Sequence, residues 1–184
     1  QVAVEAGLSG TIPYATTLLN AVNTCKAAGL LRDAMMYDEK VREIYIHNIE
    51  DSDFRYVNLY HNMGLLFQEM GDYESACDCM ERALSIAMLY QEARVEIAIV
   101  YTSLATCQLK LMRYQEAIGN LRHAFALFEK DEERDYHYSG ALSAMGEAQY
   151  RLGNYPQAAI FYEHALFEIE KHMGKNPFYQ MTQE

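Results

Sequence analysis

Apolar and small residues recur along this chain at helical spacing. In the segment 60–67 they fall at i, i+3, i+4 and i+7, a pattern that places side chains on one face of an α-helix; they are Tyr60, Met63, Gly64 and Phe67. Gly71 and Asp72 interrupt the pattern. It resumes at helical spacing in Tyr73, Ala76, Met80, Ala83 and Leu84. The segment therefore predicts two amphipathic helices joined by a tight turn.

The small residues of this segment predict close packing between its two helices. A glycine inside a helix costs about 1 kcal/mol relative to alanine, so Gly64 within a strong helical pattern indicates a packing requirement. We expect Gly64 and Ala76 to let the helices approach, and Tyr60, Phe67 and Tyr73 to fill the space beside them.

The same pattern occurs four times. The equivalent small or near-small positions are Val22, Gly64, Ala105 and Gly146, which are separated by 42, 41 and 41 residues. The copy around Val22 is the weakest, and in the third copy Met112 stands where a glycine is expected. Three separations that agree within one residue indicate an internal repeat.

The repeated unit resembles the tetratricopeptide repeat, a helix-turn-helix unit that stacks into a solenoid. The ordinary period of that repeat is about 34 residues. The longer period found here is similar to that of the kinesin light chain type and of long-period repeats in bacterial regulators. The resemblance implies an all-α fold, a right-handed superhelical solenoid of four repeats with a C-terminal capping helix.

The repeats are expected at 11–52, 53–93, 94–133 and 134–174, after the end of a preceding element at 1–10 and before a capping or truncated helix at 175–184. The expected helices are 12–28, 31–48, 53–70, 73–89, one that ends near 111, 114–130, 134–152, 155–172 and 178–183. Thr11 and Ser52 are the expected N-caps of the first and third helices.

Charge narrows the classes of partner. The net charge is −11, and the basic residues are scattered, which argues against nucleic-acid binding through this segment. The acidic runs 50–53 and 131–135 lie between repeats and are expected to be solvated linkers; an acidic docking surface is the alternative. No run approaches the roughly 18 apolar residues of a membrane span, so we expect a cytoplasmic protein without membrane contact. The initial Gln1 indicates a fragment or a processed chain.

The chain carries no recognisable catalytic or metal-binding motif. Its four cysteines, at positions 25, 77, 79 and 107, lie within predicted helices and form no CxxC pair, so we expect reduced thiols and no zinc site. There is no GxSxG elbow and no glycine-rich phosphate loop. We therefore expect a protein that is not an enzyme and that needs no cofactor.

The resemblance also implies where a ligand would bind. In the family, residues at the second, fifth, ninth and twelfth positions of each first helix face a concave groove. Together with Asn62, which matches an asparagine of the family's carboxylate-binding members, this correspondence gives as peptide-binding candidates Asn23, Lys26, Asn58, His61, Asn62, Leu65, Gln68, Thr102, Thr106, Glu147 and Tyr150. Some of these rows could instead pack against a capping helix. Binding of a free C-terminal carboxylate is not expected, because Leu19, Ile99 and Ser103 replace the required cations.

Three hypotheses for function follow. The leading one is a non-enzymatic scaffold for protein-protein interaction that binds an extended peptide or a partner helix in the groove. The second is the peptide-sensing part of a larger bacterial regulator, which the architecture resembles. The third is an oligomerisation spacer that self-associates through its exposed end helices.

Overall fold

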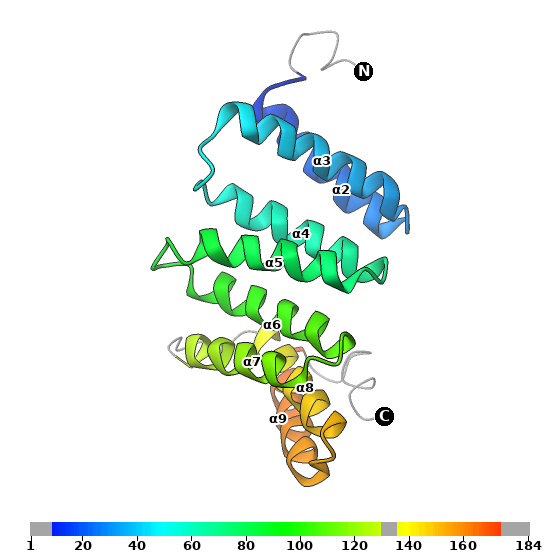
Figure 1. Cartoon of the computed structure of the whole chain (residues 1–184), viewed down its shortest axis with the longest axis vertical. Helices are drawn as coiled ribbons and strands as arrows, with labels where there is room; N and C mark the ends of the chain where they lie inside the picture. The colour runs from blue at the N-terminus through cyan, green and yellow to red at the C-terminus, as the bar shows by residue number, and fades with distance from the viewer. Residues whose placement is uncertain (1–8, 130–135, 174–184) are drawn as a thin grey trace. The chain divides into compact units, whose positions relative to one another are not determined.

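The computed structural model describes residues 9–129 and 136–173, and within these ranges all regular secondary structure is helical (Figure 1). The helices are α2 (Ile12–Ala27), α3 (Leu31–Asn48), α4 (Arg55–Glu69), α5 (Tyr73–Ala87), α6 (Arg94–Lys110), α7 (Tyr114–Phe128), α8 (Tyr136–Arg151) and α9 (Tyr155–Met173). The expected capping helix at 178–183, the element expected at 1–10 except for its last two residues, and the acidic run 131–135 lie outside the described residues.

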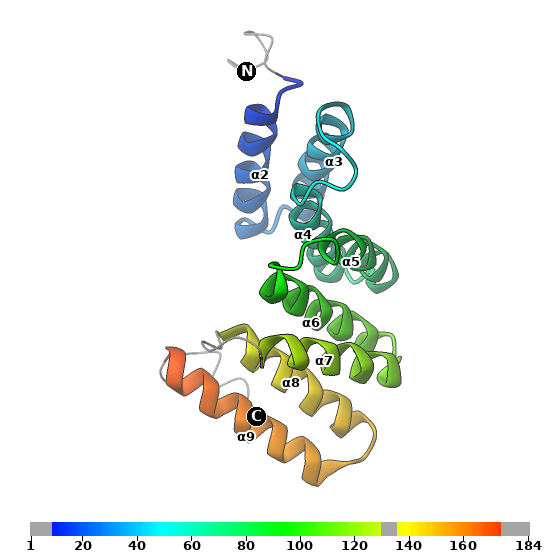
Figure 2. The same cartoon turned by 90° about the vertical axis from the view of Figure 1, so that its left-hand side faces the viewer.

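Consecutive helices pack as hairpins, which confirms the predicted all-α class. The pairs are α2 with α3, α4 with α5, α6 with α7 and α8 with α9. The chain divides into two compact units, unit 1 (Gln1–Tyr90) with α2 to α5 and unit 2 (Gln91–Glu184) with α6 to α9. Within unit 1, α3 packs on α4; within unit 2, α8 packs on both α7 and α6 (Figure 2).

One close approach recurs between the two helices of a hairpin. A Cβ added to Gly64 would lie 3.0 Å from Met80 Cγ, and one added to Gly146 would lie 2.8 Å from Tyr162 Cε1. Each partner follows its glycine by sixteen positions, and the same spacing joins Ala105 to Leu121, which belong to one buried cluster. The packing role predicted for Gly64 is confirmed.

The first hairpin departs from this rule. Counting sixteen positions from Val22 leads to Asp38, so a carboxylic acid stands where the later hairpins carry Met80, Leu121 and Tyr162. Asp38 is fully buried. This substitution explains in physical terms why the sequence pattern of the first repeat is the weakest.

The turns inside the hairpins share one geometry. Gly29, Gly71 and Gly153 have positive φ angles of 72°, 81° and 80°, and Met112 occupies the equivalent position in the third hairpin with φ 59°. The following N–H donates to a carbonyl five residues earlier in each case, as from Arg113 to Gln108 at 2.8 Å, which is the helix-ending Schellman bond. Met112 is the one residue of the four whose Cβ is strained by this backbone conformation.

The third helix begins two residues later than expected. The helix α4 begins at Arg55 instead of position 53, and Ser52 is not its cap. Instead the Asp53 carboxylate accepts hydrogen bonds from the Arg55 backbone and guanidinium at 2.7–2.9 Å, while the Ser52 carbonyl accepts one from the Tyr90 hydroxyl at 2.8 Å. Thr11 does occupy the N-cap position of α2 but makes no side-chain cap bond.

Two glycines of α8 give a matched test of the close approach. Gly146→Ala is expected to lower the free energy of unfolding by about 1–3 kcal/mol, because the new methyl group would overlap the Tyr162 ring. Gly140→Ala meets nothing within 4 Å, so it should raise stability by up to about 1 kcal/mol through helix propensity. Urea unfolding followed by circular dichroism measures both; a loss of the same size in both variants would contradict the packing argument.

Met112→Gly is expected to stabilise the chain. It removes the strain of a side chain at φ 59°, for a gain of about 1 kcal/mol and a rise in melting temperature of about 2–4 °C. The reciprocal control is Gly153→Met, which introduces the strain at the equivalent turn and should lower the melting temperature by a similar amount. An unchanged melting temperature for Met112→Gly would show that the turn holds methionine without cost.

Candidate functional site

The structure places all eleven candidate residues on the first helices of the hairpins, and none of them is buried. Asn23, Asn58 and Tyr150 are exposed. The others are half-buried: Lys26, His61, Asn62, Leu65, Gln68, Thr102, Thr106 and Glu147. The family's twelfth groove position corresponds to Leu109 in α6. This residue is not accessible like the eleven candidates, since it is only 4% exposed and belongs to the core of unit 2.

In unit 2 the candidate residues come from two helices that pack side by side, α6 and α8. We call the surface formed by Thr102, Thr106, Ser143, Glu147 and Tyr150 the first-helix face of unit 2. The first helices of unit 1, α2 and α4, make few direct contacts with each other. Unit 2 therefore joins its candidate residues into one surface more closely than unit 1 does.

The polar groups of the first-helix face retain hydrogen-bonding capacity. The hydroxyls of Thr102 and Thr106 each donate to the carbonyl one turn earlier in α6, at 2.9 Å, which leaves their lone pairs as acceptors. The Ser143 hydroxyl is buried and has no hydrogen-bond partner among the described residues. Next to it along α8, the Cβ position of Gly140 opens into unoccupied space. The two threonine hydroxyls can therefore accept hydrogen bonds from the backbone of an incoming chain.

A charged cluster borders this face. Glu147 Oε1 lies 3.4 Å from Lys110 Nζ on α6 and 3.4 Å from Arg151 NH2 on α8. Both distances are longer than those of tight charge-assisted hydrogen bonds. The Lys110 and Arg151 side chains remain 40% and 53% exposed, so most of their donors point to solvent. Glu147 thus links α6 to α8, and because one carboxylate contacts two cations, the cluster keeps a net positive charge.

Aromatic rings extend the same surface. Tyr150 is 56% exposed and contacts the Tyr155 ring edge-on at a centroid distance of 5.4 Å. Tyr162, which covers Gly146, has its pKa raised mainly by burial and further by the nearby Glu147 carboxylate, while Arg151 acts in the opposite direction. This phenol therefore stays neutral beside the charged cluster.

Sequence reasoning missed Lys110, Arg151 and Tyr155. Lys110 and Arg151 stand 41 residues apart, at equivalent positions near the ends of α6 and α8, where unit 1 has Ala27 and Glu69. The signal was present, since comparing charges between equivalent repeat positions would have singled them out. The family-based row of groove positions ends one residue before each of them.

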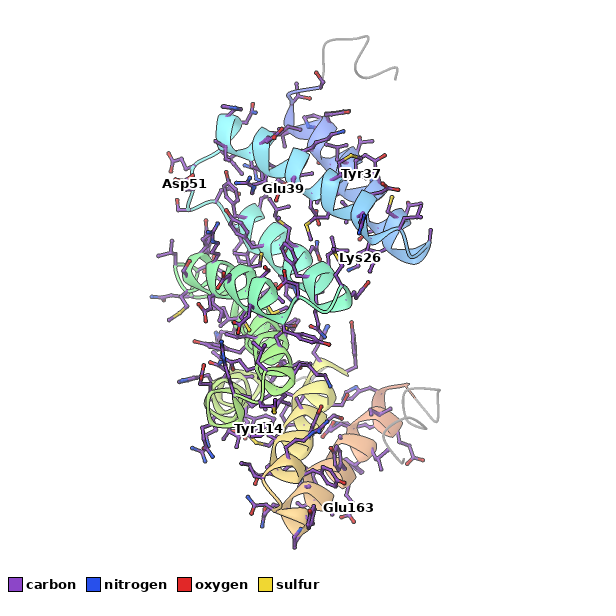
Figure 3. All side chains as sticks on the ribbon, turned by 45° about the vertical axis from the view of Figure 1, so that its right-hand side comes forward. Lys26, Tyr37, Glu39, Asp51, Tyr114 and Glu163 are labelled. Carbon is purple, nitrogen blue, oxygen red and sulfur yellow. The ribbon has the colours of Figure 1, made fainter. Side chains whose placement is uncertain are left out.

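In unit 1 the candidate Lys26 lies near the buried Asp38, and both Lys26 on α2 and Glu39 on α3 are labelled in Figure 3. Neither oxygen of Asp38 has a hydrogen-bond partner among the described residues. Burial raises the pKa of Asp38 from 3.8 to about 7, Lys26 opposes this rise, and Glu39 adds to it. The acid is therefore protonated in much of the folded population near neutral pH.

The described ranges give no support for two other kinds of site. They contain no group of three or more His, Cys, Asp or Glu side chains arranged to hold a metal ion. They also contain no helix that is long and apolar enough to cross a membrane.

Comparison with known families decides the identity of the repeat. The family model described as tetratricopeptide repeat matches residues 55–130 and, in a second register, residues 96–166, and together these matches span more than half of the chain. The chain belongs to the tetratricopeptide repeat family. Repeats of this family typically serve as non-enzymatic scaffolds that bind protein partners, which agrees with the sequence interpretation at this coarser level.

Solved structures of tetratricopeptide type resemble the chain. BtubC from P. vanneervenii superposes with a TM-score of 0.78 at 16% identity, over 89% of this chain and 66% of that one. A putative kinesin light chain from Podosopora anserina, with TPR-like repeats, gives 0.77 at 14% identity over 92% and 81%. The apo form of RapI gives 0.76 at 17% identity over 90% and 45%. At these identities the likeness shows the fold. No curated protein matches the sequence.

This tetratricopeptide chain spans about two thirds of BtubC and less than half of RapI. The predicted similarity to kinesin light chain repeats is confirmed at the level of fold.

The buried acid of the first repeat predicts a specific pH dependence of stability. Because the pKa of Asp38 is about 7 in the folded chain and 3.8 in the reference state, unfolding releases a proton between these values. The free energy of unfolding should therefore fall as pH rises from about 4 to about 7, by up to about 4 kcal/mol, and change no further above that.

Asp38→Asn isolates this contribution, because asparagine stays neutral. As pH rises from 4 to 7, the wild type should lose unfolding free energy that the variant keeps, so the variant should become more stable relative to the wild type. Asp53→Asn is the control: Arg55 lowers the Asp53 pKa to about 2, so this carboxylate adds stability that is lost only as pH falls from about 4 towards 2. A constant difference for Asp38→Asn across pH 4–7 would disprove the buried-acid account.

Proposed function

We propose that this chain is a protein-interaction module that binds an extended segment of a partner protein on the first-helix face of unit 2. The observation that carries the proposal is the meeting of α6 and α8, which brings accessible polar and aromatic side chains from two repeats into one surface.

The composition of this face suits an extended polypeptide. The backbone of such a segment carries one donor and one acceptor per residue, and these need partners when it docks. Thr102 and Thr106 supply acceptor lone pairs on this face.

The exposed Tyr150 supplies the apolar part of recognition. A tyrosine adds a large contact area at a small entropic cost, and residues of this type often dominate binding energies at interfaces. Its edge-on contact with Tyr155 holds the ring in place before binding. A positioned aromatic ring beside polar groups with spare acceptor capacity suits a preorganised peptide site.

The face of unit 1 contributes a second row with the same chemistry. Asn58, Asn62 and Gln68 on α4 are amides that can both donate and accept, and the half-buried Leu65 lies among them. Unit 1 by itself therefore carries side-chain amides that can pair with a peptide backbone.

The proposal predicts that a bulky charged residue on the first-helix face abolishes peptide binding. Peptides of about twelve residues, which reach about 40 Å when extended, would be selected from an unbiased display library against the wild-type chain. Thr106→Arg should lower the affinity of the selected peptides at least roughly tenfold, because it blocks the surface between α6 and α8. Fluorescence anisotropy measures the affinity, and circular dichroism confirms the fold.

The matched control is Gln115→Arg, which adds the same side chain at an exposed position of the second helix α7. Its affinity should equal that of the wild type. Equal loss in both variants, or full binding by Thr106→Arg, would overturn the proposed site. Sedimentation of the unliganded chain over the same concentrations separates this function from the alternative of self-association, and a library that yields no binder would favour that alternative.

A further inference from the structure

Unit 2 carries a strained and exposed residue that its packing does not explain. Met112 adopts φ 59° at a turn where the other three hairpins use glycine, and its side chain is 73% exposed. Residues held in sparsely populated backbone conformations cluster at functional sites. Because the Met112 side chain is mostly exposed, it is available for contact with a partner.

The neighbouring helix ends add positive charge. Lys110 lies two residues before Met112, at the end of α6, and Arg151 ends α8; both converge on Glu147 from adjacent helices. The equivalent residues of unit 1 are Ala27 and Glu69, so this pair is not a general requirement of the repeat. Two cations around one carboxylate leave a local excess of positive charge on a chain whose net charge is −11.

Exposed apolar side chains lie along the same end of the helices. Leu152 follows Arg151 and is 38% exposed, and Tyr150 and Tyr155 present their rings on either side of the α8–α9 turn. Methionine adapts its shape to different partners because it is unbranched and polarizable. The surface therefore combines adaptable apolar contacts with two cations that have donors to spare.

We propose that this edge, formed by Lys110, Met112, Tyr150, Arg151, Leu152 and Tyr155, docks an acidic segment of a partner protein that also carries apolar side chains. The inference rests on the proposed function in taking unit 2 as a peptide-binding unit, and it adds the chemistry of the partner. An acidic segment is repelled by the rest of the chain, so this cationic edge determines where it binds.

The chemistry of the pair fits carboxylates. Lys110 offers three donors and Arg151 offers five, arranged in a planar fork that matches a carboxylate. Their contacts with Glu147 are 3.4 Å long and occupy few of these donors. A partner carboxylate can therefore join the cluster without breaking it.

The test uses two synthetic peptides of about twelve residues, long enough to cross the edge when extended. In one, aspartate alternates with leucine and phenylalanine; in the other, lysine replaces every aspartate. The acidic peptide should bind the wild-type chain, and its affinity should fall at least roughly tenfold between about 0.05 M and 0.5 M salt. The basic peptide should not bind, and a single-stranded DNA oligonucleotide should not displace the acidic one.

Variants of the edge identify the contacts. Lys110→Glu with Arg151→Glu should lower the affinity for the acidic peptide by at least roughly tenfold. If that variant does not fold, Lys110→Gln with Arg151→Gln removes the charges without creating repulsion against Glu147. Met112→Gly should weaken binding several-fold while raising the melting temperature. A merely structural turn residue would change the melting temperature alone.

The outcomes separate this inference from the proposed function. Full binding by both charge variants, or displacement by DNA, would overturn the acidic-partner inference. If library-selected peptides bind the wild type and fail to bind Thr106→Arg, while the acidic peptide never binds, the proposed function stands and this inference falls. Loss of acidic-peptide binding in the edge variants supports the inference even if Thr106→Arg still binds the library-selected peptides.

Discussion

Close approach between the two helices of a hairpin, seen at Gly64 and Gly146, is the constraint on which the rest of the structure depends. A small residue of the first helix lies against a larger residue sixteen positions later, as Gly64 does against Met80 and Gly146 against Tyr162. Because a Cβ at either glycine would come within 3.0 Å of its partner, the distance between the helices is set by the absence of that atom. The first helices then present a defined face, on which the candidate binding residues lie.

The helices and the repeat were predictable because they depend on local spacing. The 41-residue and 42-residue separations located four hairpins, and each of the seven described helices whose two ends were both predicted begins and ends within two residues of its predicted bounds. The start of α4 was not predictable from propensity, since Ser52 is a good cap by type. Its carbonyl is held by Tyr90, 38 residues away, and such a contact leaves no local pattern in the sequence.

The candidate site was predictable only in part. Thr106 and Glu147 became candidates through the resemblance to the family, whereas the side-by-side packing of α6 and α8 is a tertiary property. The convergence of Lys110 and Arg151 on Glu147 depends on that packing, so no single helix reveals it. Asp38 shows the reverse case. Its position in the repeat was visible in the sequence, but its burial without a hydrogen-bond partner required the structure.

Each unit contains a residue that departs from the repeat pattern. In unit 1 the irregular residue is Asp38, which points inward and links the stability of the first hairpin to pH. In unit 2 the irregular residue is Met112, which is exposed at a turn two residues after Lys110. A buried acid weakens a hairpin near neutral pH, while an exposed methionine at a strained turn leaves the core intact. The pH-dependent part of the stability therefore belongs to the first hairpin, whereas the binding surface that we propose belongs to the α6–α8 pair. Under that proposal, partner recognition by unit 2 does not depend on the protonation of Asp38.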